Sequence, residues 1–201
     1  MNSRKGLLLV VMEPPASLEE EFNDWYDTEH FPQRSALPGF QSASRWVCIS
    51  GWPRWLAVYD LASPAALESD SYRAVSGSNS TPWSRRVLPR TVGRMRVVAE
   101  QTLPGDALTL ESARTSRLLV ARYPAIVPQR EDAVCNELIS NFRALHGVLQ
   151  VRLFASVADY WVIAEFDYPL SAETAASTVG RIGTKGADIL NLYVPYYRDK
   201  A

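Results

Sequence analysis

The chain is poor in the residues that bind metals and form disulfides. Of its 201 residues, two are cysteine and two are histidine. Cys48 and Cys135 have no CxxC spacing and no cluster of histidines near them. The sequence therefore indicates neither a zinc site nor a disulfide framework, and we expect two buried thiols. Neither a glycine-rich phosphate loop nor a Ser-His-Asp set is recognisable.

An excess of positive charge and a long apolar run are also missing. The 21 Lys+Arg balance 22 Asp+Glu, for a formal net charge of -1, so we expect no nucleic-acid partner. The apolar run from Leu7 to Met12 is too short for a signal peptide and ends at Glu13-Pro14 without a cleavage site. No stretch reaches the roughly 18 apolar residues that span a bilayer. The sequence therefore predicts a cytoplasmic protein without a membrane partner.

The sequence does contain a weak internal repeat. Three short matches occur in the same order: "LLVVMEP" at Leu8 with "LLVARYP" at Leu118, "ALPGF" at Ala36 with "ALHGV" at Ala144, and "AVYD" at Ala57 with "AEFD" at Ala164. The offsets are 110, 108 and 107 residues. Because the order is kept and the offset drifts little, the three matches together indicate two copies of one structural unit.

Each copy has the pattern βαββαβ. The first copy predicts strands at 7–12, 41–49, 55–61 and from Gly93, with a helix from Ser17 that Pro32 limits and a second helix at 64–74. The second copy predicts strands at 118–123, 149–156, 160–168 and 189–194, with helices at 130–145 and 172–181. This order is typical of the ferredoxin-like fold, whose sheet carries helices on one face only.

The strands "LLLVV" and "WLAVYDL" are apolar at successive positions, which requires two buried faces. We therefore expect an α+β fold in which two tandem ferredoxin-like units pack sheet to sheet as an intrachain α/β barrel. The units are residues 1–103 and 114–201, joined by the polar, Gly/Pro-bearing stretch between them. A further homo-oligomer is left open.

The stretch "NDWYDTEHFPQRSALPGF" holds the candidate chemistry. At 3.6 residues per turn, Glu29 falls in the apolar stripe of Phe22 and Trp25, and His30 falls on its flank. A carboxylate there must be protonated, paired or facing a cavity, and His30 and Arg45 are candidate partners. Either Glu29 and His30 tie the helix end to its surroundings, or they line a pocket where burial raises the glutamate pKa and His30 exchanges protons.

The motif "WYDTEHFPQRSALPGF" followed by "RW" resembles the helix end of EthD-like members of the dimeric α/β-barrel superfamily. Superfamily members include small-molecule monooxygenases, polyketide cyclases, decarboxylases, lactone isomerases and haem enzymes. The resemblance implies a barrel of two sheets with an apolar pocket between sheet and helices, and His30 as the polar group facing it. The second copy has Leu138 at the position of His30, which predicts a structural partner with a degenerate site.

The sequence thus predicts a small-molecule enzyme that binds an apolar or aromatic, polyketide-like compound and uses no cofactor. The predicted catalytic residues are His30, as general acid or base, and Glu29, which orients it. The predicted substrate-binding residues are Trp25, Tyr26, Arg45, Tyr59 and Trp83. Residues 72–92, which the second copy lacks, form either a lid or a surface helix with Trp83 on the core. Two alternatives remain open: a non-catalytic ligand-binding or scaffold barrel, and a haem protein with His30 as proximal ligand.

Overall fold

The first half of the chain forms a four-stranded antiparallel sheet with helices on one face. Its strands are β1 (Gly6–Glu13), β2 (Phe40–Ser50), β3 (Trp55–Leu61) and β4 (Val92–Leu103). Its α-helices are α1 (Glu19–Trp25), α2 (Phe31–Ser35), α3 (Asp70–Arg73) and α4 (Pro82–Val87), and a π-helix, η2 (Tyr26–His30), joins α1 to α2. Short 3-10 turns are η1 (Ala16–Leu18), η3 (Pro64–Glu68), η4 (Gly77–Asn79) and η5 (Leu88–Arg90). The strand order is β4-β1-β3-β2.

The second half repeats this arrangement. It contains η6 (Ser112–Arg114), β5 (Arg117–Pro124), α5 (Ala133–Arg143), β6 (Val148–Ala155), β7 (Asp159–Phe166), α6 (Ala172–Val179) and β10 (Ile189–Pro195), with a small hairpin of β8 (Arg181–Ile182) and β9 (Lys185–Gly186). Its strand order, β10-β5-β7-β6, corresponds strand by strand to the order β4-β1-β3-β2 of the first half. The computed structural model describes residues 4–124, 133–157, 159–183 and 185–198, so the first three residues of the helix predicted at 130–145 lie outside the described residues.

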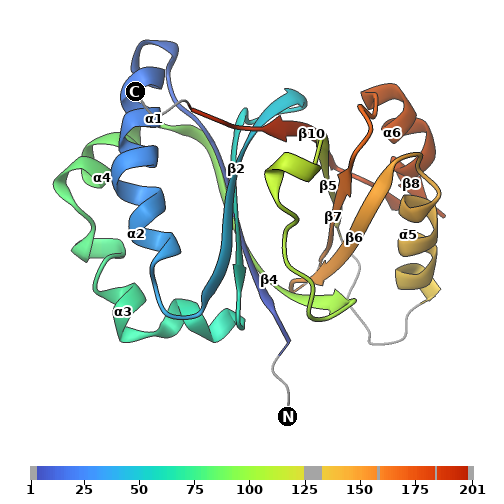
Figure 1. The fold of residues 1–201 in the computed structure, drawn as a ribbon, viewed down its shortest axis with the longest axis horizontal. Helices are drawn as coiled ribbons and strands as arrows, with labels where there is room; N and C mark the ends of the chain where they lie inside the picture. The colour runs from blue at the N-terminus through green and yellow to red at the C-terminus, as the bar shows by residue number, and fades with distance from the viewer. Residues whose placement is uncertain (1–3, 125–132, 158, 184, 199–201) are drawn as a thin grey trace.

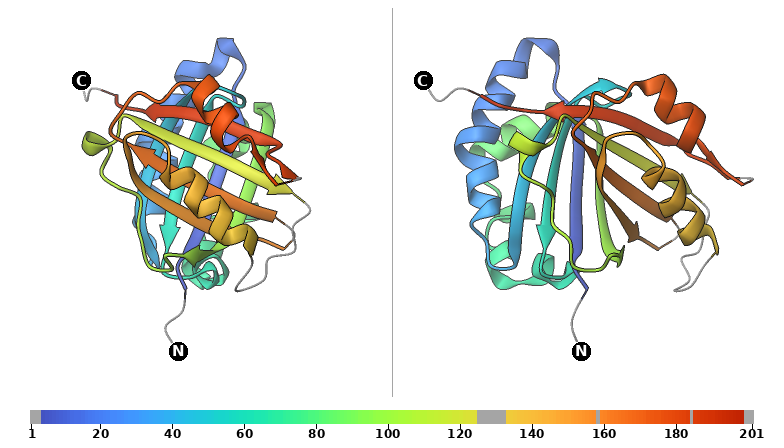
Figure 2. Two further views of the ribbon diagram at one scale, coloured as in Figure 1. Left: turned by 90° about the vertical axis from the view of Figure 1, so that its right-hand side faces the viewer. Right: turned by 45° about the vertical axis from the view of Figure 1, so that its right-hand side comes forward.

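The two sheets join edge to edge into one closed barrel (Figure 1). Strand β10 pairs with β2, with Val194 opposite Val47, and β4 pairs with β6, with Glu100 opposite Ala155. The helices of each half lie on the outer side of its own sheet, at opposite ends of the molecule (Figures 1 and 2). The predicted fold class, two ferredoxin-like units that form an intrachain α/β barrel, is confirmed.

The strands are buried on both faces because one face lines the barrel and the other carries the helices. In β3, Leu56 and Val58 belong to the cluster that fills the barrel, whereas Trp55, Ala57 and Tyr59 belong to the cluster beneath the first-half helices. Every residue of β3 is buried. This is the physical reason for the run of successive apolar residues in its sequence.

The segment that connects the halves crosses one end of the barrel and is anchored to it by buried polar side chains. The Gln101 side chain donates to the carbonyl of Ala107 and accepts from its N–H. The Asp60 carboxylate accepts from the N–H of Thr109 at 2.6 Å, and Arg152 donates to Asp60 at 2.6 Å. Asp60 and Arg152 are 1% and 0% exposed, so the connection replaces solvent as the partner of interior charges.

Two helix predictions are wrong in detail. The helix expected at 64–74 is a 3-10 turn followed by the four-residue α3, because Ser69 is extended and its hydroxyl caps the N–H of Tyr72. Pro32 does not end the first helix but lies in the first turn of α2. A proline fits there because the amides of a helix's first turn need no partner within that helix.

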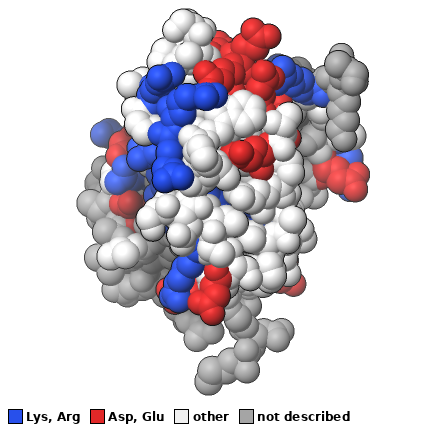
Figure 3. All heavy atoms as spheres, turned by 90° about the vertical axis from the view of Figure 1, so that its left-hand side faces the viewer, with Lys and Arg blue, Asp and Glu red and all other residues white. Residues whose placement is uncertain are grey.

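The helix-covered face of the first half has charges of both signs. Exposed arginines on α4, η5 and β4 are Arg85, Arg86, Arg90, Arg94 and Arg96. Figure 3 shows basic side chains gathered along one side of this face and acidic ones beside them. Among the described residues, no helix is long and apolar enough to cross a membrane.

Candidate functional site

The predicted motif lies on the π-helix η2, and this changes where its side chains point. The N–H of Phe31 bonds to the carbonyl of Tyr26, an i→i+5 bond. A π-turn has more residues than the 3.6 of an α-helix, so the angles expected for Glu29 and His30 are wrong. His30 instead lies over Trp25, with ring centroids 4.5 Å apart, and meets the edge of Tyr26 at 5.3 Å. The π-turn thus brings His30 from the flank into the aromatic core.

Glu29 is joined to α4. Its Oε1 accepts a hydrogen bond from Thr81 Oγ1 at 2.5 Å and a longer one from Ser84 Oγ at 3.5 Å. Ser84 Oγ also accepts from Trp25 Nε1 at 3.1 Å. Within the described part of the chain, Glu29 has no hydrogen bond to His30. The carboxylate expected to orient the histidine instead links the helix that carries it to residues 81–84.

His30 is a neutral imidazole in a positively charged neighbourhood. Burial, together with Arg34 and Arg45, lowers its pKa to about 3. Its Nδ1 is buried and lacks a hydrogen-bond partner in the structure as described. A neutral imidazole of this kind accepts or donates one hydrogen bond, but its low pKa makes it a weak base until an anion lies beside it.

Arg45 is fixed by polar partners and by aromatic rings. It pairs with Asp27 Oδ1 and donates to Asn23 Oδ1 at 2.8 Å. Its guanidinium carbon lies 4.3 Å from the centres of both the Tyr26 and the Tyr196 rings. Asp27 is therefore turned toward Arg45 rather than toward solvent. Ion pairing and cation–π contact hold Arg45 rigidly at the junction of β2 and η2.

Tyr59 and Tyr26 are buried beneath these helices. Burial raises the pKa of both, that of Tyr59 well above its ordinary value, so both hydroxyls stay protonated at neutral pH. The two hydroxyls influence each other electrostatically, yet that of Tyr59 has no hydrogen bond of normal geometry among the described residues. Trp83 is half-buried on α4, and its Nε1 donates to Glu21 Oε1 at 3.2 Å. Trp83 therefore links α4 to α1 and packs against the buried cluster beneath these helices, which includes Phe22, Trp25 and Tyr59.

An open groove runs beside this cluster. It measures about 710 Å³, within the range of small-molecule sites. Its lining comes from the motif helix, β2, the connection and the C-terminal segment: Asp24, Asp27, Thr28, Phe31, Ala43, Ser44, Arg45, Ser112, Tyr196, Tyr197 and Arg198. Phe31 separates the groove from the buried tyrosine, since its ring lies 5.8 Å from that of Tyr59. Of the predicted site residues, Arg45 faces the groove directly, and the others lie behind it or on α1 and α4.

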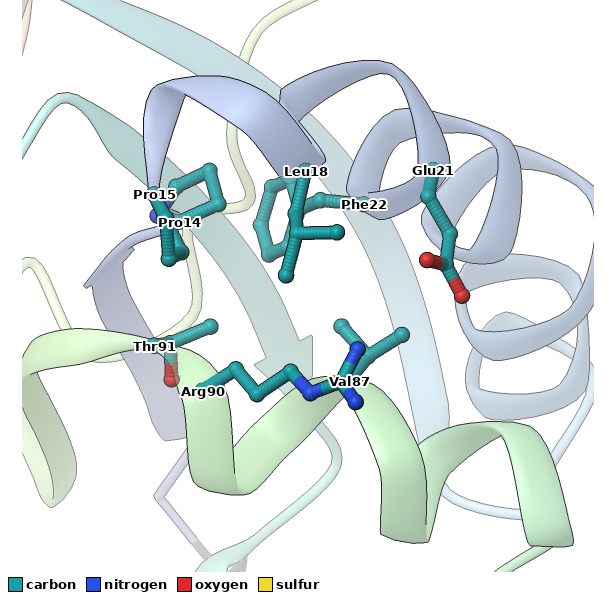
Figure 4. Close-up of a pocket in the computed structure, with 8 residues that line it drawn as sticks. All are labelled: Pro14, Pro15, Leu18, Glu21, Phe22, Val87, Arg90 and Thr91. Atoms are coloured by element: carbon teal, nitrogen blue, oxygen red, sulfur yellow. The ribbon is translucent and has the colours of Figure 1, made fainter.

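A second hollow between α1 and α4 is too small to bind a ligand. Figure 4 shows Leu18 and Phe22 from the upper helices meeting Val87 from α4, with Pro14 and Thr91 at the side. Its volume is about 10 Å³, the space of about one water molecule. The helix layer is therefore tightly packed on this side, and the large groove is the better place for a substrate.

Arg34 is a buried residue near His30 that the sequence did not single out. It lies one turn beyond His30 on α2, is 6% exposed, and its Nη2 donates to the carbonyl of Val75 at 2.7 Å. The signal for it was its spacing of four residues from His30, which places both on one side of an α-helix. An arginine in a polar stretch is ordinarily read as exposed, so the spacing alone did not single it out.

The second half has a groove at the corresponding place, between α5 and the end of β4. It measures about 690 Å³ and is lined by Leu103, Pro104, Asn136, Ile139, Ser140, Arg143 and Ala144. Among the described residues, no histidine or aromatic side chain lines it, and Leu138 is fully buried in the core. The chemistry-bearing side chains are therefore concentrated in the first half. No group of three or more potential metal ligands occurs among the described residues.

Solved structures with the same fold include proteins described as monooxygenases. An anthrone oxidase-like protein aligns with a TM-score of 0.63 and 11% identity, over 97% of this chain and 92% of its own. A proposed monooxygenase from Lactobacillus acidophilus aligns with a TM-score of 0.57 and 8% identity, over 96% and 94%. A third, from Fusobacterium nucleatum, gives 0.53 and 11%, over 98% and 94%. No family model and no curated protein matches the sequence.

Proposed function

We propose that this protein is an enzyme that acts on a small aromatic or polyketide-like compound by proton transfer, without a resident cofactor. The observation that carries this proposal is the groove of about 710 Å³ that Arg45 and Phe31 line, with the Phe31 ring packed against the buried Tyr59. Concave sites with an apolar lining and a few convergent polar groups are typical of small-molecule enzymes. The fold neighbours favour chemistry of the monooxygenase type over cyclisation, decarboxylation or isomerisation.

Three residues have distinct roles in the proposed reaction. His30 accepts the proton that leaves the substrate, Arg45 offers positive charge to the developing enolate or phenolate, and Tyr59 donates a hydrogen bond. The low pKa of His30 opposes proton transfer in the empty site, but a bound anion nearby raises it again. In oxidation of the anthrone type, a methylene becomes a carbonyl, and O₂ supplies one oxygen atom to the product and one to water. The substrate itself then provides the electrons.

The EthD-like resemblance and the tandem repeat belong to the same proposal. The two halves share one element order and one strand order, as duplication of an ancestral unit would produce. The motif residues lie in the first half alone, so one catalytic site per chain is expected. Residues 1–103 and 114–201 remain the proposed units.

A non-catalytic ligand-binding barrel is the second candidate. The bonds from Glu29 to Thr81 and Ser84 favour it, because they are those of a structural tie. A haem protein is a third candidate, in which His30 Nδ1 would be the ligand atom without a competing partner. Absorption spectroscopy distinguishes the haem protein from the cofactor-free enzyme, since a Soret band after haem addition contradicts cofactor-free chemistry.

The deciding experiment measures turnover and stability on the same variants. Oxygen uptake is recorded with a panel of polycyclic phenols and anthrones, and native mass spectrometry identifies compounds retained on purification. If the enzyme proposal is right, His30→Ala lowers turnover about 10²–10⁴-fold while the melting temperature changes little. His146→Ala is the matched control, because His146 is exposed in the other half. A large stability loss with no specific defect in turnover or binding would instead assign His30 to the scaffold.

A further inference from the structure

Arg34 is a buried cation with no acidic partner among the residues that the structure describes. One of its terminal nitrogens, Nη2, donates to the carbonyl of Val75, and the guanidinium carbon lies 5.2 Å from the centre of the Tyr72 ring. The other, Nη1, is buried without a hydrogen-bond partner. Arginine is almost never fully buried unless it is paired, because removing its charge from water is costly. The structure therefore leaves one donor of a desolvated cation free.

Two more polar atoms without partners lie on neighbouring side chains. The hydroxyl of Tyr59, which is 1% exposed, interacts with that of Tyr26 but has no hydrogen bond of normal geometry among the described residues, and Nδ1 of His30 has no hydrogen-bond partner among them. The three groups interact electrostatically. Arg34 contributes to the lowered pKa of His30, and Tyr59 acts to raise the pKa of Arg34. Buried polar atoms are usually paired, so three unpaired ones on α2, β3 and η2 indicate a site that lacks its ligand.

We propose that Arg34, together with Tyr59 and His30, binds the anionic oxygen of an aromatic ligand. This inference rests on the proposed function for the aromatic part of the ligand and adds the ionised group that the protein recognises. The nearby carboxylates cannot satisfy Arg34, because Asp27 pairs with Arg45, and Glu29 accepts from Thr81. An external anion is therefore the missing partner.

The chemistry of the three groups selects a negatively charged oxygen. Arginine stays charged at any physiological pH and donates to oxygens. The raised pKa of Tyr59 keeps its hydroxyl a donor, and a neutral His30 donates from one ring nitrogen. Because Val75 occupies Nη2, the free Nη1 and the phenol hydroxyl suit one oxygen better than a fork-to-fork carboxylate pair. A phenolate or enolate is thus favoured over a carboxylate.

The surroundings supply flat apolar surface for the rest of the ligand. The ring of Phe31 lies 5.8 Å from Tyr59, that of Phe40 lies 5.7 Å from it, and Phe40 stacks with Tyr72 at 6.2 Å. Residues 72–80, which cover Arg34 on the outside, are mostly exposed, and Gly77 has a positive φ of 58° with open space around it. Displacement of the exposed residues 77–79, with Tyr72 and the Val75 carbonyl left in place, would let a ligand reach Nη1 without opening the barrel.

The test compares ionised and neutral probes of one shape. Binding of 4-nitrophenolate, 4-nitrobenzoate and the neutral 4-nitroanisole is measured by calorimetry at pH 8.5, on the wild-type protein and on Arg34→Met. We expect 4-nitrophenolate to bind at least about tenfold tighter than 4-nitroanisole, which corresponds to about 1.4 kcal/mol. Arg34→Met should erase this preference. Arg73→Met is the matched control, because Arg73 is an exposed arginine on the neighbouring α3 and should keep it.

Comparison of 4-nitrobenzoate with 4-nitrophenolate identifies the kind of anion that the site binds. Tighter binding of 4-nitrobenzoate than of 4-nitrophenolate would assign the site to carboxylates, and the reverse would assign it to phenolates. Equal binding of all three probes would overturn the inference. Melting temperature gives a second readout: removal of an unpaired buried cation should leave Arg34→Met at least as stable as the wild type. A less stable Arg34→Met that keeps the anion preference would make Arg34 a structural residue and refute the proposal.

The outcomes separate this inference from the proposed enzyme function. An anion preference that depends on Arg34, without turnover of any compound, would support the site and contradict the enzyme. Turnover that depends on His30, with no difference between charged and neutral probes, would support the enzyme and contradict the site.

Discussion

Two buried arginines flank the motif helix, and they differ in their partners. Arg45 has Asp27, Asn23 and four aromatic rings around it, whereas Arg34 has a carbonyl and one ring. The sequence singled out Arg45, because a carboxylate buried on the helix requires a cationic partner and Arg45 lies on the next strand. The actual partner is Asp27 rather than Glu29, since the π-turn rotates the acidic side chains relative to an α-helix.

Arg45→Met should destabilise the fold. The side chain of Arg45 is 5% exposed and that of Asp27 23% exposed, so the substitution leaves a partly buried carboxylate without its partner. We expect the free energy of unfolding to fall by about 3 kcal/mol, near the lower end for broken buried pairs. Urea denaturation measures it. Arg73→Met, which removes an exposed i,i+3 pair, should change it by less than about 0.5 kcal/mol, and equal losses would contradict the assignment.

His30 should make stability depend on pH. Its pKa of about 3 in the folded protein lies below the 6.5 of the unfolded chain, so the unfolded state binds the extra proton between these values. The contribution is fully present above pH 6.5 and is lost as pH falls toward 3. At about 1.4 kcal/mol per pKa unit, the loss reaches at most about 5 kcal/mol. Urea midpoints from pH 7 to 4 should fall more steeply for wild type than for His30→Phe, and parallel curves would refute a buried neutral histidine.

At the scale of elements, the sequence predicted the strands better than the helices. Strands β3 and β5 were located within one or two residues because apolar runs between turn residues have clear ends. The π-turn was missed because helical periodicity was evaluated at 3.6 residues per turn, and no residue type marks an i→i+5 bond. The short helices between β3 and β4 were merged because their separation depends on a local bond from Ser69 to Tyr72.

Thr81 connects two of these elements and can test their coupling. Its hydroxyl caps α4 by accepting from the N–H of Ser84, and it donates to Glu29. Thr81→Val removes both bonds, so we expect a loss of about 1.5–3 kcal/mol in the free energy of unfolding. Ser171→Ala removes a similar cap from α6 alone and should cost about 1 kcal/mol. Hydrogen exchange at 82–87 should accelerate in Thr81→Val. Identical losses in the two variants would show that the Glu29 bond adds nothing.

At the scale of the molecule, the barrel was predictable and its polar interior was not. The repeat and the doubly apolar strands sufficed to indicate two sheets that cover each other. The buried group of Asp60, Arg152 and Glu165 escaped prediction, because its members are up to 105 residues apart and each lies in an apolar strand. Long-range pairing of this kind has no periodicity, so only the closed barrel reveals it.

The closed barrel predicts that residues 1–103 cannot remain a soluble monomer alone. The separated half would expose the barrel-facing side chains of its sheet: Leu7, Leu9, Val11, Trp46, Leu56, Val58, Val97 and Ala99. Exposing each large side chain costs about 1.5–3 kcal/mol, so their sum is comparable with the whole of the roughly 5–15 kcal/mol that stabilises a typical domain. The half would also leave Asp60 without Arg152 and open the edges of β2 and β4.

Self-association can repair most of these losses, because β2 of one copy can pair with β4 of another as β2 pairs with β10 and β4 with β6 in the full chain. We therefore expect the 1–103 fragment to elute as a dimer or as aggregates in size-exclusion chromatography with light scattering. The chain of 201 residues, run in parallel, gives the elution volume of the closed barrel. Coexpression with residues 114–201 should recover soluble protein, since it restores both edge pairings and the Arg152 partner. A fragment that stays monomeric and folded at micromolar concentration would contradict a barrel interior shared by the two halves.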